Sequence, residues 1–156
     1  MTDAKEKPAA GSKVTLRQVT EDTVRTICDL SVREDQTKFV ASNAVSIAQA
    51  YFSKYAWFRA IYADETPVGF VMLYDNPEKP EYFLWRLMID ARYQGMGFGR
   101  RALELLIEYV RTRPGAVELL TSVHQAPGGP QEFYEKMGFA LTGDMEEGEA
   151  LMRLRL

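Results

Sequence analysis

The chain has only one cysteine and one histidine among its 156 residues. A single cysteine, Cys28, excludes an internal disulfide and is typical of a protein from a reducing cytoplasm. The two residues cannot complete a zinc site of the usual Cys/His kind, so we expect no metal. No stretch approaches the ~18 apolar residues of a membrane span. Residues 1–12 lack the apolar core of a signal peptide, and we therefore expect a cytoplasmic protein that associates with no membrane.

Basic residues are too few for a nucleic-acid-binding surface. Lys and Arg number 19 against 22 Asp and Glu, a net charge of −3, whereas phosphate binding requires a basic surplus. A mildly acidic balance suits a small cationic substrate better. Hydrophobic residues make up 46% of the chain, an ordinary globular proportion, and the length is that of one domain. We expect a flexible tail over residues 1–12 and a single domain over residues 13–156.

The apolar pattern predicts a mixed α/β domain. Apolar runs predict strands over residues 14–19, 57–62, 68–74, 82–89, 117–123, 139–142 and 150–156. Helical spacing predicts helices over residues 24–30, 45–52, 103–110 and 131–137, the first capped by Thr20 and holding Cys28 in the core. Turns are expected over residues 63–67, 75–80 and, in an acidic segment, 144–149. A helix between two buried strands also predicts parallel pairing by a right-handed crossover.

Residues 94–100, Gln-Gly-Met-Gly-Phe-Gly-Arg, lie between a predicted strand and the most amphipathic helix. Glycines let backbone N–H groups approach a ligand, and a helix N-terminus adds unpaired donors with a partial positive charge. Arg100 and Arg101 are disfavoured at that helix end unless an anion binds there. A dinucleotide fingerprint needs glycine at position 100 and a P-loop needs Gly-Lys-Ser/Thr, so both alternatives fail. The segment predicts another kind of anion site, with a tight turn carrying solvated arginines as the alternative.

Gln94, Gly97 and Gly99 form the pattern Gln-x-x-Gly-x-Gly. Here the chain resembles the GNAT superfamily of N-acetyltransferases, whose pyrophosphate loop carries Arg/Gln-x-x-Gly-x-Gly/Ala. The preceding residues 85–90 resemble the same superfamily, as do residues 133–139 through their Tyr-x-x-x-Gly-Phe pattern. The resemblance covers most of the chain. It implies one GNAT domain, an α/β fold with a central mixed, splayed sheet flanked by helices, that uses acetyl-CoA as its co-substrate.

A narrower resemblance lies in the first half of the chain. Residues 34–43 and 46–50 are similar to bacterial spermine/spermidine acetyltransferases of the BltD type. Residues 86–90 and 93–95 fit the same group. The resemblance implies transfer of acetyl from acetyl-CoA to a primary amine, with a polyamine such as spermidine or spermine as the expected acceptor.

The resemblance also implies which residues hold acetyl-CoA. Backbone groups of the central strand pair with the pantetheine arm, and an N–H group there, expected at Leu87, polarises the thioester carbonyl. The glycine loop holds the pyrophosphate. The expected cofactor-binding residues are Leu87, Met88, Ile89, Gln94, Gly95, Met96, Gly97, Phe98, Gly99 and Arg100.

Acetyl transfer also needs a proton donor for the leaving thiolate and an acceptor for the proton of the amine. Tyr134 matches the general acid of the family by its place in Tyr-x-x-x-Gly-Phe, and a phenol with a pKa of about 10 suits that role. Glu34, Asp35 and Glu81 are the candidates for the general base, and the same carboxylates are expected to bind the amine. Solvated surface charges are the alternative for each. His124 is a further candidate for a proton role.

Neither an activated cysteine nor an activated serine is evident, so direct transfer without a covalent enzyme intermediate is expected. Two alternatives remain open. The acceptor could be a peptide N-terminus, an amino acid or an aminoglycoside. The chain could also be a non-catalytic module that binds coenzyme A, although such a binder would not need the proton donor Tyr134. The sequence does not determine the oligomeric state, and a homodimer remains an option.

Overall fold

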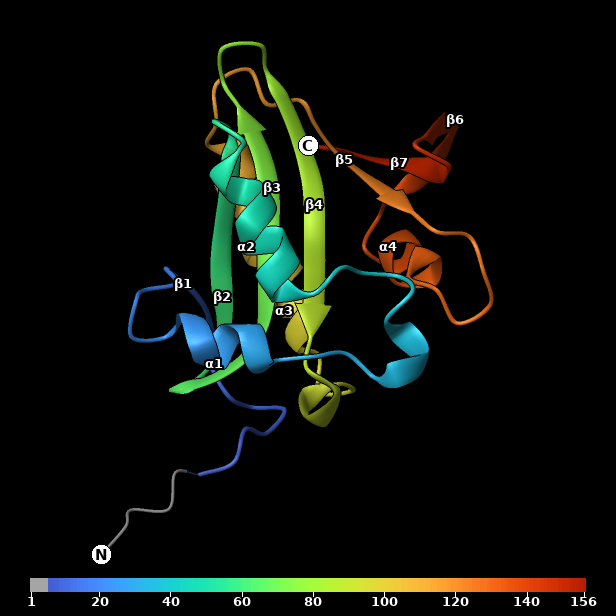
Figure 1. The fold of residues 1–156 in the computed structure, drawn as a ribbon. Coiled ribbons are helices and arrows are strands. Elements are labelled where there is room, and N and C mark those ends of the chain that lie inside the picture. Colours follow the sequence, from blue (N-terminus) through green and yellow to red (C-terminus); the bar gives the residue numbers. More distant parts are fainter. Residues whose placement is uncertain (1–5) are drawn as a thin grey trace, which may run out of the picture.

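The computed structural model describes residues 6–156 of the chain, and Figure 1 shows the order of its elements. The strands are β1 (Val14–Arg17), β2 (Ala56–Ala63), β3 (Thr66–Asn76), β4 (Glu81–Ile89), β5 (Glu118–Val123), β6 (Ala140–Glu146) and β7 (Glu149–Arg155). The helices are α1 (Val24–Asp29), α2 (Asn43–Tyr51), α3 (Phe98–Arg111) and α4 (Gln131–Lys136), with short 3-10 helices η1 (Glu34–Gln36) and η2 (Ala91–Tyr93). These elements confirm a mixed α/β fold.

The strands form one sheet in the order β1-β2-β3-β4-β5-β7-β6. Neighbouring strands are antiparallel, except that β4 and β5 run parallel. Parallel neighbours need a crossover connection, and α3 supplies it here. The expected parallel pairing around the glycine-preceded helix is therefore confirmed.

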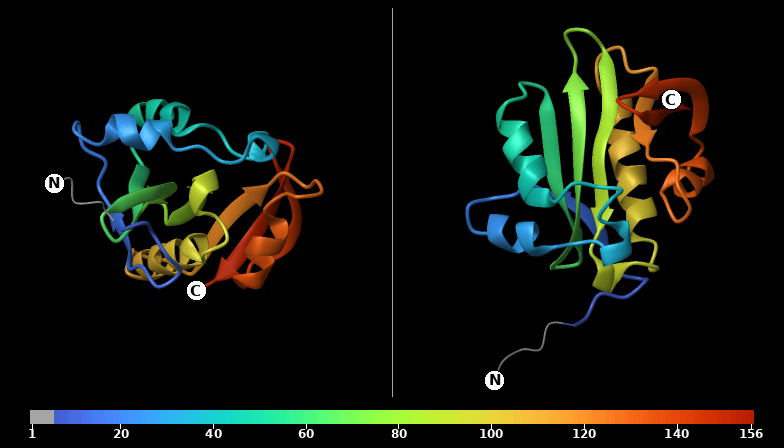
Figure 2. Two further views of the ribbon diagram at one scale, coloured as in Figure 1. Left: turned by 90° about the horizontal axis from the view of Figure 1, so that it is seen from below. Right: turned by 45° about the vertical axis from the view of Figure 1, so that its right-hand side comes forward.

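Helices cover both faces of the sheet. Seen from below in Figure 2, α1 and α2 lie over one face and α3 lies over the other. The i, i+3, i+4, i+7 spacing gives α3 one apolar side, which packs into the larger core through Leu103, Leu106, Ile107 and Val110. A smaller core, which includes Ile27, Phe70 and Met88, lies on the side of α1 and α2.

The sheet opens between its two parallel strands. β4 and β5 share only two residue pairs, at Phe83 and Leu84 of β4. The pairing of β4 with β3 then skips Trp85, which marks a β-bulge and bends the strand. Residues 85–89 consequently have no partner on the β5 side. The expectation of a splayed sheet is confirmed, and the opening creates room for a site.

Three local expectations are wrong. β6 extends to Glu146, so the expected acidic turn shrinks to Glu147 and Gly148, whose φ angles are 48° and 83°. Because β6 is an edge strand with mostly exposed side chains, it tolerates acidic residues. The residue that precedes α1 is Thr23, which makes no side-chain capping hydrogen bond, so Thr20 is not the N-cap. Cys28 is half-buried and free rather than a core residue, because it lies beside the inward side of this short helix.

The segment before β1 is held against the start of α3. The guanidinium of Arg101 donates to the backbone carbonyls of Ser12 at 2.6 Å, Ala10 at 2.8 Å and Met96 at 3.1 Å. These carbonyls give Arg101 partners at a helix end where a cation is otherwise disfavoured. Residues 1–5 of the expected tail lie outside the described residues. Within residues 6–156, no helix is long and apolar enough to cross a membrane.

Candidate active site

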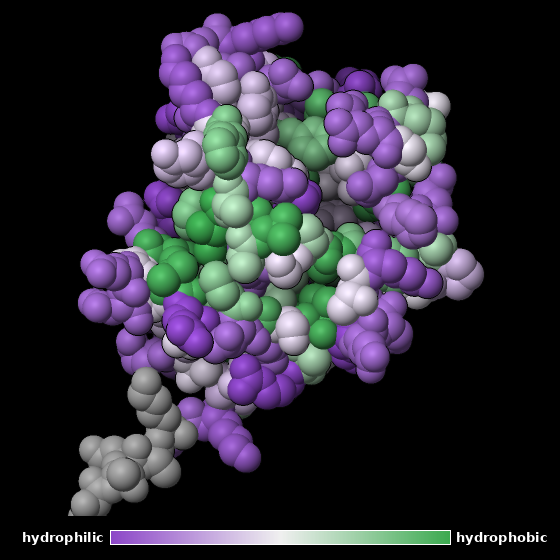
Figure 3. All heavy atoms as spheres, in the orientation of Figure 1, coloured by the Kyte–Doolittle hydropathy of each residue, from purple (hydrophilic) through white to green (hydrophobic). Residues whose placement is uncertain are grey.

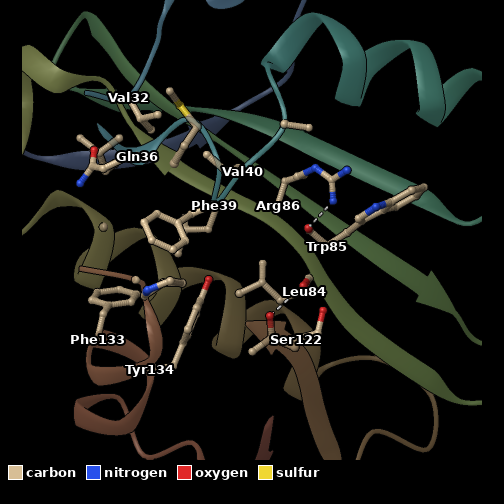
Figure 4. Close-up of a pocket in the computed structure, with 18 of the residues that line it drawn as sticks. Val32, Gln36, Phe39, Val40, Leu84, Trp85, Arg86, Ser122, Phe133 and Tyr134 are labelled. Carbon is tan, nitrogen blue, oxygen red and sulfur yellow. Dashed lines mark hydrogen bonds between the residues drawn. The ribbon is translucent and has the colours of Figure 1, made fainter. Parts of the chain in front are cut away.

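A cavity of about 1060 Å³ lies where β4 separates from β5. Its walls come from β4, the link between α1 and α2, the start of α3, α4 and the β6–β7 hairpin. Figure 4 shows Phe39 and Tyr134 on two sides of part of it. On the face drawn in Figure 3, apolar side chains gather toward the centre and polar side chains toward the rim. Segments far apart in the sequence therefore meet at one site.

The glycine loop contributes to one wall of the cavity. Gly95 and Gly97 have φ angles of 80° and 81°, in the left-handed region that favours glycine. Gly97 is the N-cap of the 14-residue helix α3 and supplies no side-chain cap. The first N–H groups of a helix have no acceptors within it, so they remain available to a ligand. Backbone donors and the helix dipole together fit a pyrophosphate group.

The cavity brings together nine of the ten residues expected to hold acetyl-CoA. They are Leu87, Met88, Ile89, Gln94, Gly95, Gly97, Phe98, Gly99 and Arg100. Met96 is the exception, because its side chain packs against the larger core rather than the cavity. The unpaired side of β4 offers backbone donors and acceptors to an extended arm, as a neighbouring strand would. Both halves of the expected binding surface therefore fit coenzyme A.

Tyr134 lies on α4 with only 6% of its surface exposed. In Figure 4 its hydroxyl points into the cavity, below Phe39 and beside Leu84. The rings of Phe133 and Phe139 pack edge-on against it, with centroids at 5.2 and 5.4 Å. This packing holds the ring in one orientation, with the hydroxyl facing the space between the diverging strands.

Burial raises the pKa of the Tyr134 phenol above its usual range. The hydroxyl of Thr121 lowers this pKa, and the carboxylate of Glu149 raises it. A phenol with a raised pKa keeps its proton at neutral pH. It can therefore donate that proton to a leaving group inside the cavity.

Carboxylates reach the cavity from two places, as Glu81, Glu146, Glu147 and Glu149. Glu81 is one of the residues that the sequence analysis expected to bind the amine. The other three lie on the β6–β7 hairpin, and the acidic composition of residues 144–149 was the only sequence signal for them. An acidic wall of this kind suits a cationic acceptor.

Two other carboxylates expected at the acceptor site do not line the cavity, namely Glu34 and Asp35. The Asp35 carboxylate pairs with Arg33 at 3.3 Å, and its side chain is 75% exposed. η1 turns the chain so that the next residue, Gln36, reaches the cavity instead. Glu34 and Asp35, which were expected to contact the amine, therefore lie outside the cavity, whereas the glutamates of the hairpin line it.

Asp90 fixes the link between α1 and α2 to the end of β4. Asp90 is only 4% exposed, and its carboxylate accepts a hydrogen bond from the backbone N–H of Ser31 at 3.0 Å. It also accepts two from Arg92, one from the backbone N–H at 3.0 Å and one from Nε at 2.8 Å. Burial raises the pKa of Asp90, but these hydrogen bonds and the Arg92 charge outweigh it, so the pKa lies below its usual value. Asp90 is thus a charged anchor beside the cavity.

His124 does not line the cavity. Its ring packs at a tilt against Phe39, with the centroids 5.7 Å apart. Its position gives no support to a proton role at the thioester. Among residues 6–156, no group of three or more His, Cys, Asp or Glu side chains could hold a metal ion.

The fold and this cavity fit an enzyme that takes its acyl group from coenzyme A. The chain belongs to the acetyltransferase (GNAT) family, whose model matches residues 17–139. It is 28% identical over 146 residues to the spermine/spermidine N(1)-acetyltransferase of Bacillus subtilis (strain 168), covering 89% of this chain and 96% of that protein. The protein is thus an acetyl-CoA-dependent N-acetyltransferase.

Two solved structures show the same fold. The PaiA N-acetyltransferase of Thermoplasma acidophilum, in complex with coenzyme A, matches with a TM-score of 0.67 and 20% identity, over 92% of this chain and 99% of that one. The aminoglycoside acetyltransferase AAC(6')-Ib, also with coenzyme A, matches with a TM-score of 0.74 and 18% identity, over 92% and 95% of the chains. The overall fold is therefore shared with both proteins.

Proposed function

We propose that the enzyme acetylates a polyamine such as spermidine or spermine by direct transfer. The observation that carries this proposal is the set of glutamates in the cavity that Tyr134 faces. A polyamine carries several ammonium groups, and each needs a partner when it leaves bulk water. Similarity to a bacterial spermine/spermidine acetyltransferase over 89% of the chain supports the same acceptor class.

Each part of the cavity has a task in this proposal. The first N–H groups of α3 bind the pyrophosphate, and the open side of β4 orients the pantetheine arm. A backbone N–H at Leu87 stabilises the oxyanion that develops on the thioester carbonyl. Acetyl-CoA supplies the activated acetyl group.

Proton transfers complete the chemistry. Glu149, with Glu81 as the second candidate, holds the ammonium and receives its proton directly or through water. Tyr134 donates a proton to the departing sulfur. The neutral amine attacks the thioester carbonyl without an enzyme-bound acetyl intermediate, because no nucleophilic side chain is needed when both substrates share one cavity.

A panel of acceptors tests the proposal. Release of free thiol from acetyl-CoA is measured with spermidine, spermine, an aminoglycoside and a peptide with a free N-terminus. We expect kcat/KM to be highest for the polyamines. A preference of tenfold or more for the peptide or the aminoglycoside would refute the acceptor class while leaving the acetyltransferase assignment intact.

A further inference from the structure

Among the described residues, two cations that line the cavity form no salt bridge, Lys38 and Arg86, and only Arg86 lies on the sheet. Arg86 follows the bulge residue Trp85 on β4 and lines the cavity. Its Nη1 donates to the backbone carbonyl of Trp85 at 3.0 Å, and its Nη2 donates to Oε1 of Gln49 at 3.1 Å. Within residues 6–156, Arg86 forms no salt bridge. The two hydrogen bonds orient the guanidinium without neutralising it.

The guanidinium of Arg86 retains unused donors. An arginine has five N–H donors, and only two of them have partners here. The Nε of Arg86 is buried and has no acceptor within the described residues. Burial lowers the pKa of Arg86, whereas the charge of Glu149 raises it. A half-buried cation of this kind is costly unless an anion compensates for its lost hydration.

Arg59 provides an internal comparison. It lies on β2, donates to the carbonyl of the preceding residue Phe58 at 2.7 Å, and has its guanidinium 4.4 Å from the centre of the Trp57 ring. Burial lowers its pKa as well. However, Arg59 does not line the cavity, and its Nε is not buried without a partner. Among residues 6–156, the Nε of Arg153 on β7 is also buried without a hydrogen-bond acceptor. Arg153, however, forms an ion pair with Glu118 at 2.7 Å and lies outside the cavity, so only Arg86 of the described residues combines an unused donor with a place in the cavity and no ion pair.

We propose that Arg86 binds a carboxylate of the acceptor, so that the enzyme acetylates the side-chain amine of diamino acids in addition to polyamines. The planar guanidinium matches a carboxylate through two parallel hydrogen bonds. The cavity glutamates provide the complementary sites for ammonium groups. A diamino acid carries an ammonium and a carboxylate on the same carbon, and a second amine at the end of its side chain.

This inference rests on the proposed N-acetyl transfer and does not change its chemistry. The side-chain nitrogen forms the new N–C bond while the thioester C–S bond breaks. The proton that the amine loses balances the proton that the thiolate gains. Arg86 and the glutamates hold the α-carbon end, which leaves the side-chain amine to reach the thioester.

Matched acceptor pairs isolate the carboxylate. L-lysine differs from cadaverine, and L-ornithine from putrescine, only by the α-carboxylate. In the wild type we expect measurable kcat/KM for all four acceptors. Arg86→Gln should lower the ratio of kcat/KM for L-lysine to that for cadaverine at least tenfold, which corresponds to about 1.4 kcal/mol. It should raise kcat/KM for cadaverine, because a repelling charge is removed from the cavity.

Two further variants distinguish recognition from structure. Arg86→Lys retains the charge but loses the planar fork, so the ratio should fall to an intermediate value. Arg59→Gln should leave the ratio within twofold of the wild type, because that side chain lies outside the cavity. Equal losses for L-lysine and cadaverine in Arg86→Gln would overturn the proposal and make Arg86 a purely structural residue.

Binding of L-lysine to the enzyme loaded with coenzyme A, measured by calorimetry, separates the two proposals. Turnover of cadaverine and putrescine without turnover or binding of the amino acids would overturn the carboxylate site and leave the proposed function standing. If the polyamines and simple diamines are not acetylated but L-lysine is, in an Arg86-dependent manner, the proposed function fails and the carboxylate site survives. Absence of both activity and binding would overturn both.

Discussion

The side-chain amide of Gln94 donates a 2.9 Å hydrogen bond to Oε1 of Gln36. The same amide donates to the backbone carbonyl of Ile89 at 2.9 Å, and Oε1 of Gln36 also accepts the backbone N–H of Arg33 at 3.1 Å. One residue of the glycine-loop motif therefore joins the end of β4 to the link between α1 and α2. This junction fixes the position of the link between α1 and α2, one wall of the cavity, relative to the glycine loop.

Substitution of the two glutamines should separate their contributions. Gln36→Leu removes two neutral hydrogen bonds, from Gln94 and from the backbone N–H of Arg33, each worth about 0.5–1.5 kcal/mol. It should raise KM for the acceptor several-fold with little change in kcat. Gln94→Leu also loses the bond to Ile89, so it should raise KM for acetyl-CoA as well. Steady-state kinetics measures both constants, with the exposed Gln125→Leu as the control. Equal kinetic constants in all three variants would contradict a positioning role.

Gly97 and Gly143 form a matched pair for testing the glycine loop. Both have a positive φ, 81° and 91°, and a Cβ added to either meets nothing within 4 Å, but only Gly97 lines the cavity. Gly97→Asp and Gly143→Asp therefore incur similar backbone strain. Only the first places a carboxylate where we expect the pyrophosphate, and it should raise KM for acetyl-CoA tenfold or more. Unchanged acetyl-CoA binding by calorimetry in Gly97→Asp would remove the loop from the cofactor site.

Tyr134→Phe tests the proton donor. The change removes one oxygen and preserves the ring packing, so acetyl-CoA affinity should persist. The turnover number should fall by roughly 10²–10⁴, the usual range for a lost general acid. Tyr109→Phe is the control, because its hydroxyl donates to Asp75 at 2.6 Å outside the cavity. Near-wild-type turnover of Tyr134→Phe would assign the proton to water or to another donor.

The pH dependence gives a second test of the same residue. Because burial raises the pKa of Tyr134, its proton should remain in place up to and beyond the ordinary phenol value of about 10. The wild-type turnover number should therefore show no decline due to this group between about pH 8 and 9.5. A decline in that window that is absent from Tyr134→Phe would show that the phenol ionises earlier than its burial implies.

The cofactor side of the cavity could be predicted from sequence because its information is local. Gln94, Gly97 and Gly99 are close in the chain, and the end of β4 precedes them with only the short helix η2 between. The apolar periodicity of α3 predicts its position on the sheet without any knowledge of the other elements. Met96 is the one expected cofactor-binding residue that does not line the cavity, although its neighbours Gly95 and Gly97 do.

The acceptor side could not be predicted in the same way. Its walls depend on how far β4 diverges from β5 and on the register of the β6–β7 hairpin, and a shift of one residue moves every side chain to the other face. Glu34, Asp35 and Glu149 all lie in polar segments of the sequence, and only the folded chain shows that Glu149 lines the cavity and the other two do not. The bulge at Trp85, which accompanies the placement of Arg86 in the cavity, has no sequence signature.

Asp90 makes stability depend on pH in a defined direction. Its pKa is below the unfolded value, so its contribution is present above about pH 4 and is lost as pH falls through the lower folded value. Asp90→Asn should lower Tm at pH 7 by a few degrees, with about 2–4 °C for each kcal/mol in a chain of this size. The difference from wild type should narrow below about pH 4, where the wild-type carboxyl becomes protonated.

Thermal unfolding between pH 7 and pH 3 measures this dependence. Asp64→Asn is the control, because Asp64 accepts the backbone N–H of Lys13 at 3.0 Å and also has a lowered pKa, but its side chain is exposed. Its replacement should change Tm less than that of Asp90 at every pH. A Tm difference for Asp90→Asn that stays constant down to pH 3 would show that shape, and not charge, is what Asp90 contributes.

Glu149 should determine how well a polyamine binds. Its electrostatic influence on both Tyr134 and Arg86 places it near the proton donor as well as the acceptor side of the cavity. Glu149→Gln keeps the size of the side chain and removes its charge, so KM for spermidine should rise several-fold while KM for acetyl-CoA stays within twofold. Added salt should shrink the difference, because charges are screened within about 10 Å at 0.1 M.

The control for Glu149→Gln removes the carboxylates of Glu34 and Asp35. The sequence analysis expected both at the acceptor site, but neither lines the cavity. Glu34→Gln with Asp35→Asn takes away more charge than Glu149→Gln does, so a purely long-range attraction of the polyamine would make the double variant the weaker binder. Direct contact predicts the opposite order, with the double variant within twofold of wild type in KM for spermidine. Initial rates over a range of spermidine concentrations at two salt concentrations distinguish the two outcomes. If the double variant shows the larger rise in KM, direct contact between Glu149 and the polyamine is refuted.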